Sequence, residues 1–549
     1  MNGPDFGLFY AGDAYSTSGK IMGRQSAGKA LMAGVARRWQ TGDIRGVGLK
    51  RAAGQAMFTQ LKAGGFEGRL TWSSLPGDAA LERLGAVYYP APVPPDMAHM
   101  RNTLGPAAYS LFGVTHTLSS EAAMDSLGGM VLAPYQTWDG LICTSTVALS
   151  VARKLQTEMR EWQAEHIGAT RFNSPSMSVI PLGVDAPSFV RTPEQIAEAR
   201  AEFALQEDEV AFLFAGRLVF HGKANPAVFY KALEAASQRI GGRIVSIEAG
   251  VYPNEGMANA YRAARAELAP SVRFIEVDGA VQADYDRAWK AADVFVTLSD
   301  NVQETFGLTP VEAMAAGLPV LVSDWNGYKD TVRDGIDGYR IPVVIPAADS
   351  GAGLDLAMRH ALGRDNYDFF IGRLSMMTVV DPEVLLDRLV TLATDAGLRQ
   401  KLGAAGRARA VADFDWPVIL DRYSGFARDL SELRLAAVAV RPRAPYPYRN
   451  RPDPFALFED YPTQGLGEAW RILARPLEER GLEQLLALNM TNYVIDSDCL
   501  PADLIRKVHG TAIASEHTVA SLLDSAGRSP QAWRALMWLM KFDLLKAVP

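Results

Sequence analysis

The chain has 549 residues, of which 48% are hydrophobic and 21% charged, and its formal net charge is −7. Because single hydrophobic cores stop growing at roughly 250 to 300 residues, a chain of this length should form about two to four folding units. The composition excludes a disordered or membrane-spanning protein, and the negative charge argues against non-specific binding to nucleic acid.

The N-terminus and the cysteines predict a cytoplasmic location. The opening stretch MNGPDFGLFYAGD lacks the basic region and apolar core of a secretory signal. No apolar run approaches the ~20 residues that cross a bilayer. The two cysteines, Cys143 and Cys499, are too few for a disulfide framework or a structural zinc site, which fits a reducing compartment.

The first predicted elements alternate between strands and helices. The run FGLFYAGD (6–13) predicts a buried strand, and apolar residues at helical spacing between Ser26 and Trp39 predict the helix that follows. Further strand-like runs lie within 113–120, 138–145 and 177–185. Repeated strand–helix–strand units predict a parallel sheet, so we expect a Rossmann-like domain over residues 1–190.

A Gly-rich stretch between these first two elements, MGRQSAGKAL (22–31), contains the G-x-x-x-x-G-K of a P-loop. Ala30 stands where a P-loop needs Ser or Thr to hold magnesium, and Gly28 and Lys29 already fall within the predicted helix. A P-loop phosphotransferase is therefore disfavoured. In the loop just upstream, Gly19 and Gly23 would let the backbone approach a ligand at the end of the first strand.

A second series of strands follows a polar stretch from Thr192 to Asp208. Its apolar runs lie within 209–218, 242–251, 272–279, 292–299 and 318–324. They predict a second Rossmann-like domain over 191–435, closed by helices between Leu398 and Leu435. Two such doubly wound domains in tandem place a ligand cleft between the carboxyl ends of their strands.

The rest of the chain predicts a linker and a helical extension. The Pro- and Arg-rich stretch RPRAPYPYRNRPDP lies within the predicted linker 436–455. In the extension, 456–549, the segment SPQAWRALMWLMKFDLL (529–545) reads as a helix. It puts Trp533, Leu536, Met540 and Leu544 at helical spacing, which favours a packed core over a cofactor site. The extension has no assigned role, and contact with a partner or another copy is one interpretation.

The richest chemical signal is QETFGLTPVEAMAAGLPVLVSD (303–324). Glu304 lies in the loop after a predicted strand, where a carboxylate has no capping or core role. The sequence T-P-V-E from Thr309 to Glu312 predicts a capping box that starts a helix, whose free N–H groups would suit a diphosphate. From the residues alone, Glu312 is either the reciprocal cap or a ligand contact.

Three further residues are candidates for the same site. Arg217 and Lys223 fall six positions apart across a strand–loop–helix junction and could grip a diphosphate, although two solvated basic residues are the alternative. His116 follows a short β-like run and is either a sugar contact or a structural histidine. The D-x-D of Asp496–Asp498 lies in the extension, so we predict no metal site there.

These motifs resemble the family 4 retaining glycosyltransferases, which have the GT-B fold of two Rossmann-like domains facing a cleft. The resemblance covers roughly residues 5 to 430 and rests on two glutamates eight positions apart, the Phe-Gly-Leu between them, the following EAMAAGLPV, and an Arg-x5-Lys pair. In that family the first glutamate lies beside the transferred sugar and the second holds the ribose hydroxyls. The Arg and Lys bind the pyrophosphate, and a Gly-rich loop faces the donor.

The resemblance implies catalytic roles for Glu304 and His116. The nucleotide-sugar contacts that it implies are Arg217, Lys223, Glu312, Gly23, Phe306, Gly307, Leu308 and Thr309. It further implies retaining transfer from a nucleotide-diphosphate sugar to a glycan, lipid-linked or small-molecule acceptor. We expect no metal or other cofactor, because Arg217, Lys223 and a helix N-terminus could neutralise the leaving diphosphate. Envelope or capsular glycan synthesis is the expected setting, and the basic pairs Arg37/Arg38 and Lys50/Arg51 would permit contact with the inner face of a membrane.

The chain departs from the family pattern in two places. GYKD (327–330) stands where many relatives have Gly followed by Pro-Glu, and VIPAADSGAGLDLAMRHALGRDNYDFFIGR (344–373) looks like an insertion. Both would affect acceptor or nucleotide recognition. A phosphorylase or nucleotide-sugar epimerase on the same fold, and a sugar-binding module without catalysis, stay open as alternatives.

Overall fold

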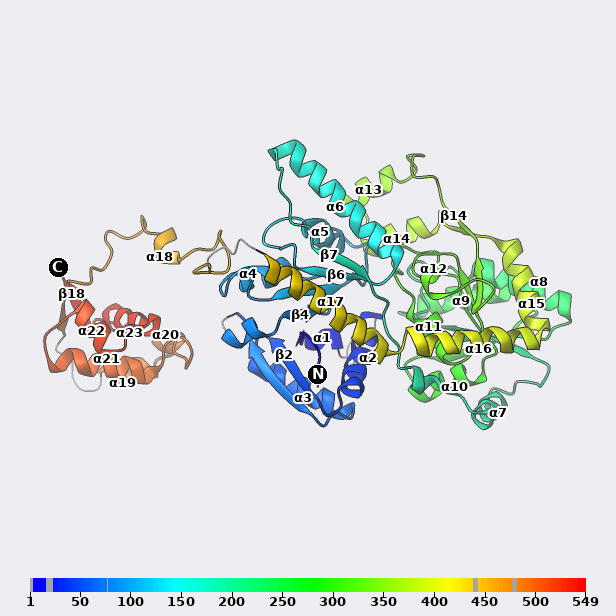
Figure 1. The fold of residues 1–549 in the computed structure, drawn as a ribbon, viewed down its shortest axis with the longest axis horizontal. Coiled ribbons are helices and arrows are strands. Elements are labelled where there is room, and N and C mark those ends of the chain that lie inside the picture. The colour runs from blue at the N-terminus through cyan, green and yellow to red at the C-terminus, as the bar shows by residue number, and fades with distance from the viewer. Residues whose placement is uncertain (1–2, 16–22, 77, 438–442, 476–480) are drawn as a thin grey trace. The chain divides into compact units, whose positions relative to one another are not determined.

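The structure is a computed structural model that describes residues 3–15, 23–76, 78–437, 443–475 and 481–549 (Figure 1). By their contacts the residues divide into two units, 1–449 and 450–549. Within the described ranges, no helix has the length and apolar character needed to span a bilayer.

The first part of unit 1 is a seven-stranded parallel sheet with the strand order β3-β2-β1-β4-β5-β6-β7. Its strands are β1 (Gly7–Phe9), β2 (Asp43–Gly48), β3 (Arg69–Ser74), β4 (Ala86–Tyr89), β5 (Ser110–Val114), β6 (Gly140–Cys143) and β7 (Ser176–Val179). The helices between them are α1 (Gly12–Tyr15), α2 (Gly23–Arg38), α3 (Arg51–Ala63), α4 (Pro95–Arg101), α5 (Glu121–Gly129) and α6 (Thr146–Ile167). The predicted β-α-β domain is confirmed.

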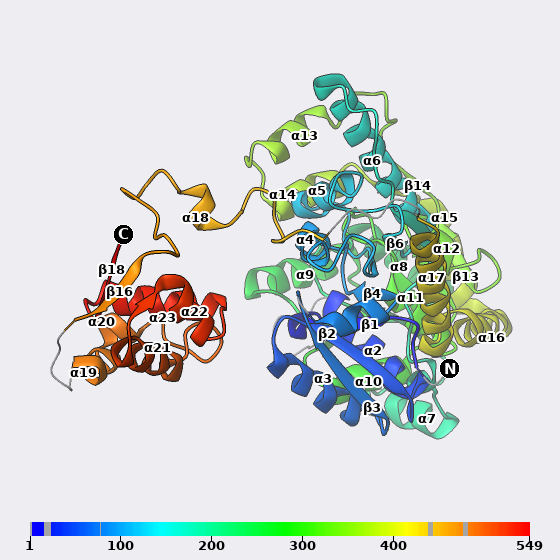
Figure 2. The same cartoon turned by 60° about the vertical axis from the view of Figure 1, so that its left-hand side comes forward.

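Helices lie on both faces of this sheet (Figure 2), and a hydrophobic core fills the space on each side. Neighbouring side chains of β1 point to opposite faces, because side chains alternate along a strand. Leu8 accordingly packs into one core with Leu31 of α2, and Phe9 into a second core with Met97 of α4. Strands β1, β5, β6 and β7 overlap the runs predicted from the sequence, whereas β2, β3 and β4 were not predicted. Edge strand β3, RLTWSS, is mostly polar and therefore lacks the apolar run of a buried parallel strand.

The second part of unit 1 is a six-stranded parallel sheet with the order β10-β9-β8-β11-β12-β13. Its strands are β8 (Val210–Ala215), β9 (Ile244–Gly250), β10 (Arg273–Asp278), β11 (Val294–Thr297), β12 (Val320–Ser323) and β13 (Gly338–Ile341). The first five match the predicted runs. All but one of the residues of central strand β8 are buried, which is why it reads as an unbroken apolar run.

Helices surround the second sheet, and one segment interrupts the pattern. The helices are α7 (Pro193–Glu202), α8 (Ala227–Ile240), α9 (Glu255–Leu268), α10 (Gln282–Ala291), α11 (Leu308–Ala315), α12 (Tyr328–Thr331), α15 (Pro382–Thr394) and α16 (Ala396–Asp413). The segment that looks like an insertion begins in β14 (Val343–Val344) and forms α13 (Leu354–Ala361) and most of α14 (Tyr367–Ser375), ahead of β15 (Val379–Val380). Strands β14 and β15 pair antiparallel, which closes the base of this segment.

Both sheets reverse their strand order beside the first strand of each domain. The reversal lies between β1 and β4 in the first sheet and between β8 and β11 in the second. In open α/β sheets, ligands bind beyond the carboxyl ends of the strands at such a switch point. The loops that follow β8 and β11 are therefore where the topology favours a ligand site.

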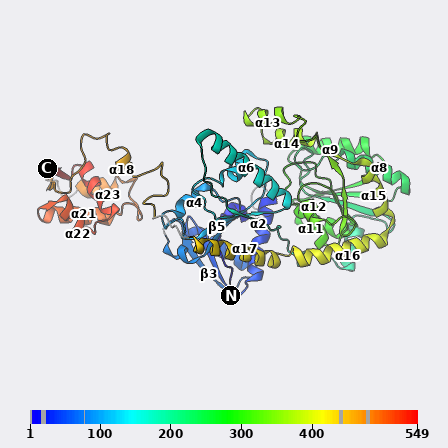
Figure 3. The same ribbon diagram turned by 45° about the horizontal axis from the view of Figure 1, so that its top comes forward.

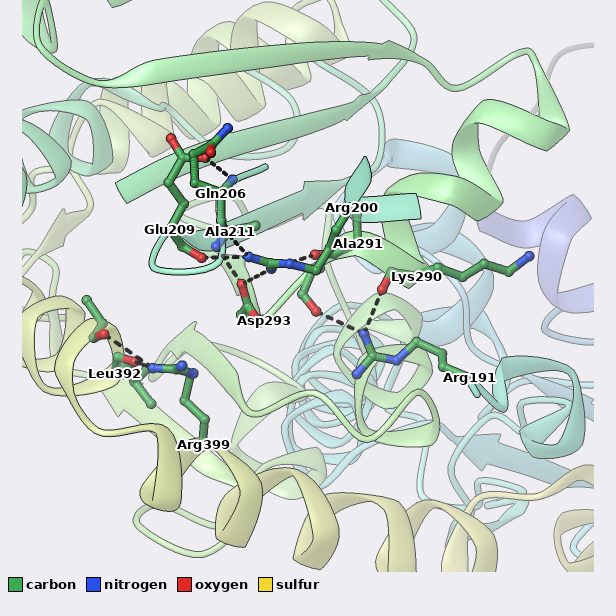
Figure 4. Close-up of polar contacts among 12 residues, drawn as sticks. Arg191, Arg200, Gln206, Glu209, Ala211, Lys290, Ala291, Asp293, Leu392 and Arg399 are labelled. Carbon is green, nitrogen blue, oxygen red and sulfur yellow. Dashed lines mark hydrogen bonds and ion pairs between the residues drawn. The ribbon is translucent and has the colours of Figure 1, made fainter. Parts of the chain in front are cut away.

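Arg191 anchors the segment between the two sheets to the second one (Figure 4). Its guanidinium donates to the carbonyl oxygens of Ala292 and Ala316, each at 2.9 Å. These residues cap the C-termini of α10 and α11, where unpaired carbonyls carry the negative end of the helix dipole. Burial lowers the pKa of Arg191 to about 10. Arg200, in the following helix α7, makes a further contact with the second domain: its Nη1 donates to Asp293 Oδ2 at 2.8 Å.

The last helix of unit 1, α17 (Trp416–Ala436), packs on the first sheet although it lies in the span predicted for the second domain. A Cβ added to Gly34 of α2 would lie 2.4 Å from the Cβ of Trp416, so the two helices touch closely. Near the other end of α17, the carbonyl oxygen of Leu430 accepts a hydrogen bond from Ser110 Oγ at 3.1 Å. The chain thus returns to the domain in which it started.

Unit 2 combines helices with a small antiparallel sheet of order β17-β16-β18 (Figure 2). Its strands are β16 (Arg471–Ala474), β17 (His517–Thr518) and β18 (Leu545–Val548), and its helices are α18 (Pro454–Leu457), α19 (Gly481–Ala487), α20 (Asn489–Asn492), α21 (Ala502–Ala514), α22 (Val519–Ser525) and α23 (Pro530–Lys541). The helix predicted over 529–545 is too long, because the chain turns at Asp543 with φ of 59° and enters β18. Its apolar face forms the core, as predicted.

Helices α22 and α23 are joined by a short turn with Gly527 at φ of 91°, which is the connectivity of a helix-turn-helix motif. Such motifs often bind DNA through their second helix. Residues 450–549 carry ten Lys and Arg against thirteen Asp and Glu, and this balance is unfavourable for a phosphate backbone.

Candidate active site

Two loops of the second sheet bring the predicted charged residues together. Arg217 and Lys223 lie in the loop between β8 and α8, and Glu304 lies in the loop between β11 and α11. Lys223 Nζ is 2.5 Å from Glu304 Oε2. Beside this pair, Arg217 Nη2 donates to Gln303 Oε1 at 2.8 Å. The cluster therefore sits at the strand-order reversal, where the topology favours a ligand.

Lys223 and Glu304 form a largely buried ion pair, with side chains 18% and 16% exposed. Burial alone would raise the pKa of Glu304, but the charge and hydrogen bond of Lys223, helped by the backbone N–H groups of Thr305 and Phe306, hold that pKa below its usual value. Burial would lower the pKa of Lys223, and Glu304 raises it instead. Lys223 is thus not a solvated loop residue, and it keeps a full positive charge at the site.

Helix α11 begins differently from the prediction. Its first residue is Leu308 and its N-cap is Gly307, whose φ is 86°. No side chain caps the helix, and Thr309 Oγ1 is buried without a hydrogen-bond partner, so the predicted capping box is wrong. The reason lies upstream: Phe306 is buried against Phe414, and Gly307 in the left-handed region turns the chain from that contact into the helix.

Gly307 and Gly327 fit tightly against the neighbouring loop. A Cβ on Gly307 would lie 2.1 Å from the ring of Tyr328, and one on Gly327 would lie 2.5 Å from the Cα of Phe306. Tyr328 is fully buried. The GYKD segment, noted in the sequence only as a departure, therefore supports the backbone that carries Glu304.

Glu312 lies one turn into α11 and is half-buried. Burial raises its pKa to about 7, and the nearby charge of Lys223 only partly offsets this effect. Since the capping box is absent, the capping role proposed for Glu312 is wrong. What remains is a carboxyl group that is poised between its neutral and charged forms near neutral pH.

The pKa of Glu312 predicts a pH-dependent nucleotide affinity. If ribose hydroxyls donate to Glu312, binding needs the carboxylate, so affinity should rise as pH increases through about 7. Between pH 6 and 8, we expect Kd for a nucleoside diphosphate to fall by about tenfold, measured by calorimetry. Glu312→Gln should bind more weakly and lose this dependence, while keeping the dependence that comes from the nucleotide itself. An affinity that falls with rising pH would contradict the assignment.

His116 follows β5 and lies where the two domains meet. Its Nε2 is 2.9 Å from the carbonyl oxygen of Pro90, and its own carbonyl oxygen accepts a hydrogen bond from Thr305 Oγ1, next to Glu304. His116 lines a small cavity with Tyr15, Tyr88 and Trp416. His116 is therefore connected to the Glu304 loop through Thr305.

Three further contacts join the two domains. Ser145 Oγ donates to the carbonyl oxygen of Thr305 at 2.9 Å. The backbone N–H and the hydroxyl of Thr146 donate to Asp330, at 2.5 and 2.8 Å. The hydroxyl of Tyr367 in α14 lies 2.9 Å from Ser119 Oγ. Gln303, Asp330, Tyr328 and Tyr367 were not among the residues predicted for the site. For Asp330 and Tyr328, the altered GYKD motif was the available signal in the sequence.

Asp330 is expected to favour the closed arrangement of the cleft. Asp330→Ala removes two hydrogen bonds to the start of α6, and because the site is partly exposed we expect a loss of about 1 kcal/mol. KM should then rise about fivefold with kcat nearly unchanged, in steady-state kinetics. Asp286→Ala, an exposed change on α10, serves as the control. A fall in kcat without a change in KM would argue against a role in closure.

The Gly-rich stretch near the N-terminus and the candidate metal ligands remain to be placed. Gly19 lies outside the described residues, as does the loop 16–22, and Gly23 is the first residue of α2. Gly28 lies inside α2, where an added Cβ would meet the carbonyl oxygen of Ala14 at 2.0 Å, so this glycine serves helix packing. Among the residues that the structure describes, no group of His, Cys, Asp or Glu could hold a metal ion.

Comparison with known proteins gives one family match and several relatives. Residues 195–360 match the family described as "Glycosyl transferases group 1". Phosphatidyl-myo-inositol mannosyltransferase of Mycobacterium tuberculosis (strain CDC 1551 / Oshkosh) is 27% identical over 354 residues, which cover 60% of this chain and 79% of the relative. D-inositol 3-phosphate glycosyltransferase of Streptomyces scabiei (strain 87.22) is 32% identical over 211 residues, or 37% of this chain and 46% of the relative.

Among solved structures, that of Anabaena Alr3699/HepE in complex with UDP is similar with a TM-score of 0.49 and 14% sequence identity. The similarity covers 77% of this chain and 99% of that chain. The matched family residues contain both charged loops described above.

Proposed function

We propose that this chain, a glycosyltransferase of the GT-B type, moves a sugar from a nucleoside-diphosphate sugar to an acceptor hydroxyl with retention at the anomeric carbon. The observation that carries the proposal is the meeting of Arg217, Lys223 and Glu304 at the strand-order reversal of the second sheet. Two fixed cations and a buried carboxylate at this point suit a diphosphate next to a sugar.

In the proposed mechanism, charge develops on the leaving β-phosphate as the bond to the sugar lengthens. Lys223 has three N–H donors, so it can hold Glu304 and the departing oxygen together. Arg217 and the free N–H groups at the start of α11, at Leu308 and Thr309, would stabilise the same charge. Glu304 would orient hydroxyls of the transferred sugar, and the leaving oxygen would take the acceptor proton on the same face.

Glu312 and His116 have separate roles in this proposal. Glu312 would accept hydrogen bonds from the ribose, and His116, through its link to Thr305, would lie on the sugar side of the cleft. Loss of Glu304 should reduce turnover more than nucleotide affinity, whereas loss of Glu312 should mainly weaken nucleotide binding. No metal is needed where two basic side chains and a helix N-terminus neutralise the diphosphate.

For the acceptor, we propose a molecule that contains inositol. The names of the two relatives point to inositol, inositol 3-phosphate and phosphatidylinositol as the first acceptors to test. The predicted setting in envelope or capsular glycan synthesis fits such an acceptor.

A screen of nucleotide sugars tests the function. Purified protein is incubated with UDP-, GDP-, ADP- and dTDP-sugars, with and without acceptors and with and without EDTA, and release of nucleoside diphosphate is measured. We expect acceptor-dependent release that EDTA does not affect, with the donor anomeric configuration kept in the product by NMR. Phosphate-dependent cleavage of a glycoside would indicate a phosphorylase, and interconversion of the nucleotide sugar without an acceptor would indicate an epimerase.

A further inference from the structure

The segment α13–α14 carries an unusual share of the exposed apolar side chains. Of the 30 large hydrophobic residues exposed among the described parts of the chain, eight lie between Val344 and Val379. They are Val344, Ile345, Leu354, Met358, Leu362, Phe369, Met376 and Val379. An apolar concentration of this kind on a surface marks a site of interaction.

Helix α13 has two apolar faces with different surroundings. Leu356 on the inner face is buried in a cluster with Phe370 of α14 and Met124 of α5. On the outer face, Leu354, Met358 and Leu362 are 74%, 60% and 60% exposed. Leu354 and Met358 are four positions apart and lie along one side of α13, and Leu362, the C-cap residue that follows the helix, extends this row. We call these three residues the outer stripe.

The inner face of the segment is attached to the candidate active site. Tyr367 of α14 bonds across the cleft to Ser119, and the carbonyl oxygen of Ile371 accepts from Asn301 Nδ2 at 3.4 Å, close to Glu304. The outer stripe is therefore carried by the same short segment that contacts Ser119 of the first domain and the loop of Glu304. Figures 1 and 3 show α13 at the periphery of unit 1.

Charged residues on this segment give it a nearly balanced surface. Arg359 and Arg373 both pair with Asp365, at 2.8 and 2.9 Å, and Asp365 is itself only 3% exposed. Arg364 is exposed and takes part in none of the ion pairs between described residues. Asp355 and Asp368 are also exposed, so attraction to anionic surfaces is weak. Any docking here depends mainly on the apolar stripe.

We propose that the outer stripe of α13 docks on a lipid bilayer, with Leu354, Met358 and Leu362 at the boundary between headgroups and acyl chains. A stripe of three side chains exposes only a few hundred Å², against about 800 Å² that each partner buries in a stable protein interface, so a second copy of the chain is a poor fit. A flat bilayer needs no complementary shape, so a short apolar stripe can insert at its surface without a matching partner. This inference goes beyond the proposed function and does not depend on the identity of the acceptor.

Vesicle binding by the full chain tests the inference. The wild type, a Leu354→Gln/Met358→Gln/Leu362→Gln variant and a control variant, Val411→Gln/Leu433→Gln/Leu435→Gln, are sedimented with vesicles of phosphatidylcholine alone or with phosphatidylglycerol. Glutamine keeps helix propensity, and the control changes three exposed apolar residues elsewhere in unit 1. We expect at least about tenfold less binding for the α13 variant only, and little effect of salt or of phosphatidylglycerol.

Three results would overturn the inference: no vesicle binding by the wild type, equal binding by the α13 variant, or a wild-type dimer that the α13 variant dissociates in light scattering. Thermal unfolding checks that each variant is folded. Donor turnover in the absence of vesicles should be the same for all three proteins. Failure of the proposed function would appear in that turnover assay for the wild type, whereas failure of the docking inference would leave it unchanged.

Discussion

Lys223→Met is expected to lower kcat by about 10³-fold, the cost of removing one main donor to charge that develops in a transition state. Two effects act in the same direction. The departing diphosphate loses a cation, and Glu304 keeps its burial without the partner that lies 2.5 Å away. With Lys223 gone, burial should raise the pKa of Glu304, because the charge and hydrogen bond that lower it are lost.

Two further variants separate chemistry from folding. Lys231→Met removes an exposed lysine from α8 and should leave kcat unchanged. Lys223→Met/Glu304→Gln removes both charges, which should recover part of the lost stability without recovering activity, because a buried charge is no longer left unpaired. Two results would contradict a role of Lys223 in the transition state. One is a double variant with activity close to that of the wild type, and the other is a kcat for Lys223→Met within tenfold of the wild-type kcat.

Gly307→Ala is expected to destabilise the protein by roughly 2 to 4 kcal/mol, since left-handed strain and steric overlap add together. The residue has φ of 86°, and the new Cβ would lie 2.1 Å from the ring of Tyr328. Because Tyr328 is fully buried, it has no room to move away. The loop that holds Glu304 must shift instead, so activity should fall together with the midpoint of thermal unfolding.

Gly317→Ala is the matched control for this prediction. Its φ is 74°, but the nearest atom to an added Cβ, in the side chain of Arg407, is 4.0 Å away. This variant should show the backbone strain alone, about 1 kcal/mol, and keep its activity. Gly307→Ala/Tyr328→Ala should relieve the overlap, so it should lose less than the sum of the two single variants. Equal effects of Gly307→Ala and Gly317→Ala would show that the contact with Tyr328 does not matter.

The parallel architecture could be predicted because its central strands are buried on both faces. Strand β8 reads VAFLFA, and a run of this kind between helical segments has few other interpretations. Strand β3, at the sheet edge, has polar residues on an exposed surface, and β2 contains two glycines, so neither gives that signal. In unit 2, the end of α23 was missed because Leu544 continues the helical spacing although the chain has already turned at Asp543.

The charged residues of the candidate site could be found because they lie in dense local motifs. Their partners across the cleft could not, since the contact between Thr146 and Asp330 joins residues 184 positions apart. The capping box failed for a different reason. The sequence T-P-V-E satisfies the local rule, but burial of Phe306 and the turn at Gly307 start the helix earlier. Tertiary packing therefore overrode a valid local signal.

Arg191 restricts where the chain can be cut and joined to the second domain of a related protein in a chimera. The family match begins at residue 195, and a chimera joined there would leave Arg191 with the other parent. The C-termini of α10 and α11 would then lose the cation that binds both of their cap carbonyls. Since α11 carries the candidate donor site at its opposite end, a crossover point after residue 190 should give functional chimeras more often than one only a few residues later.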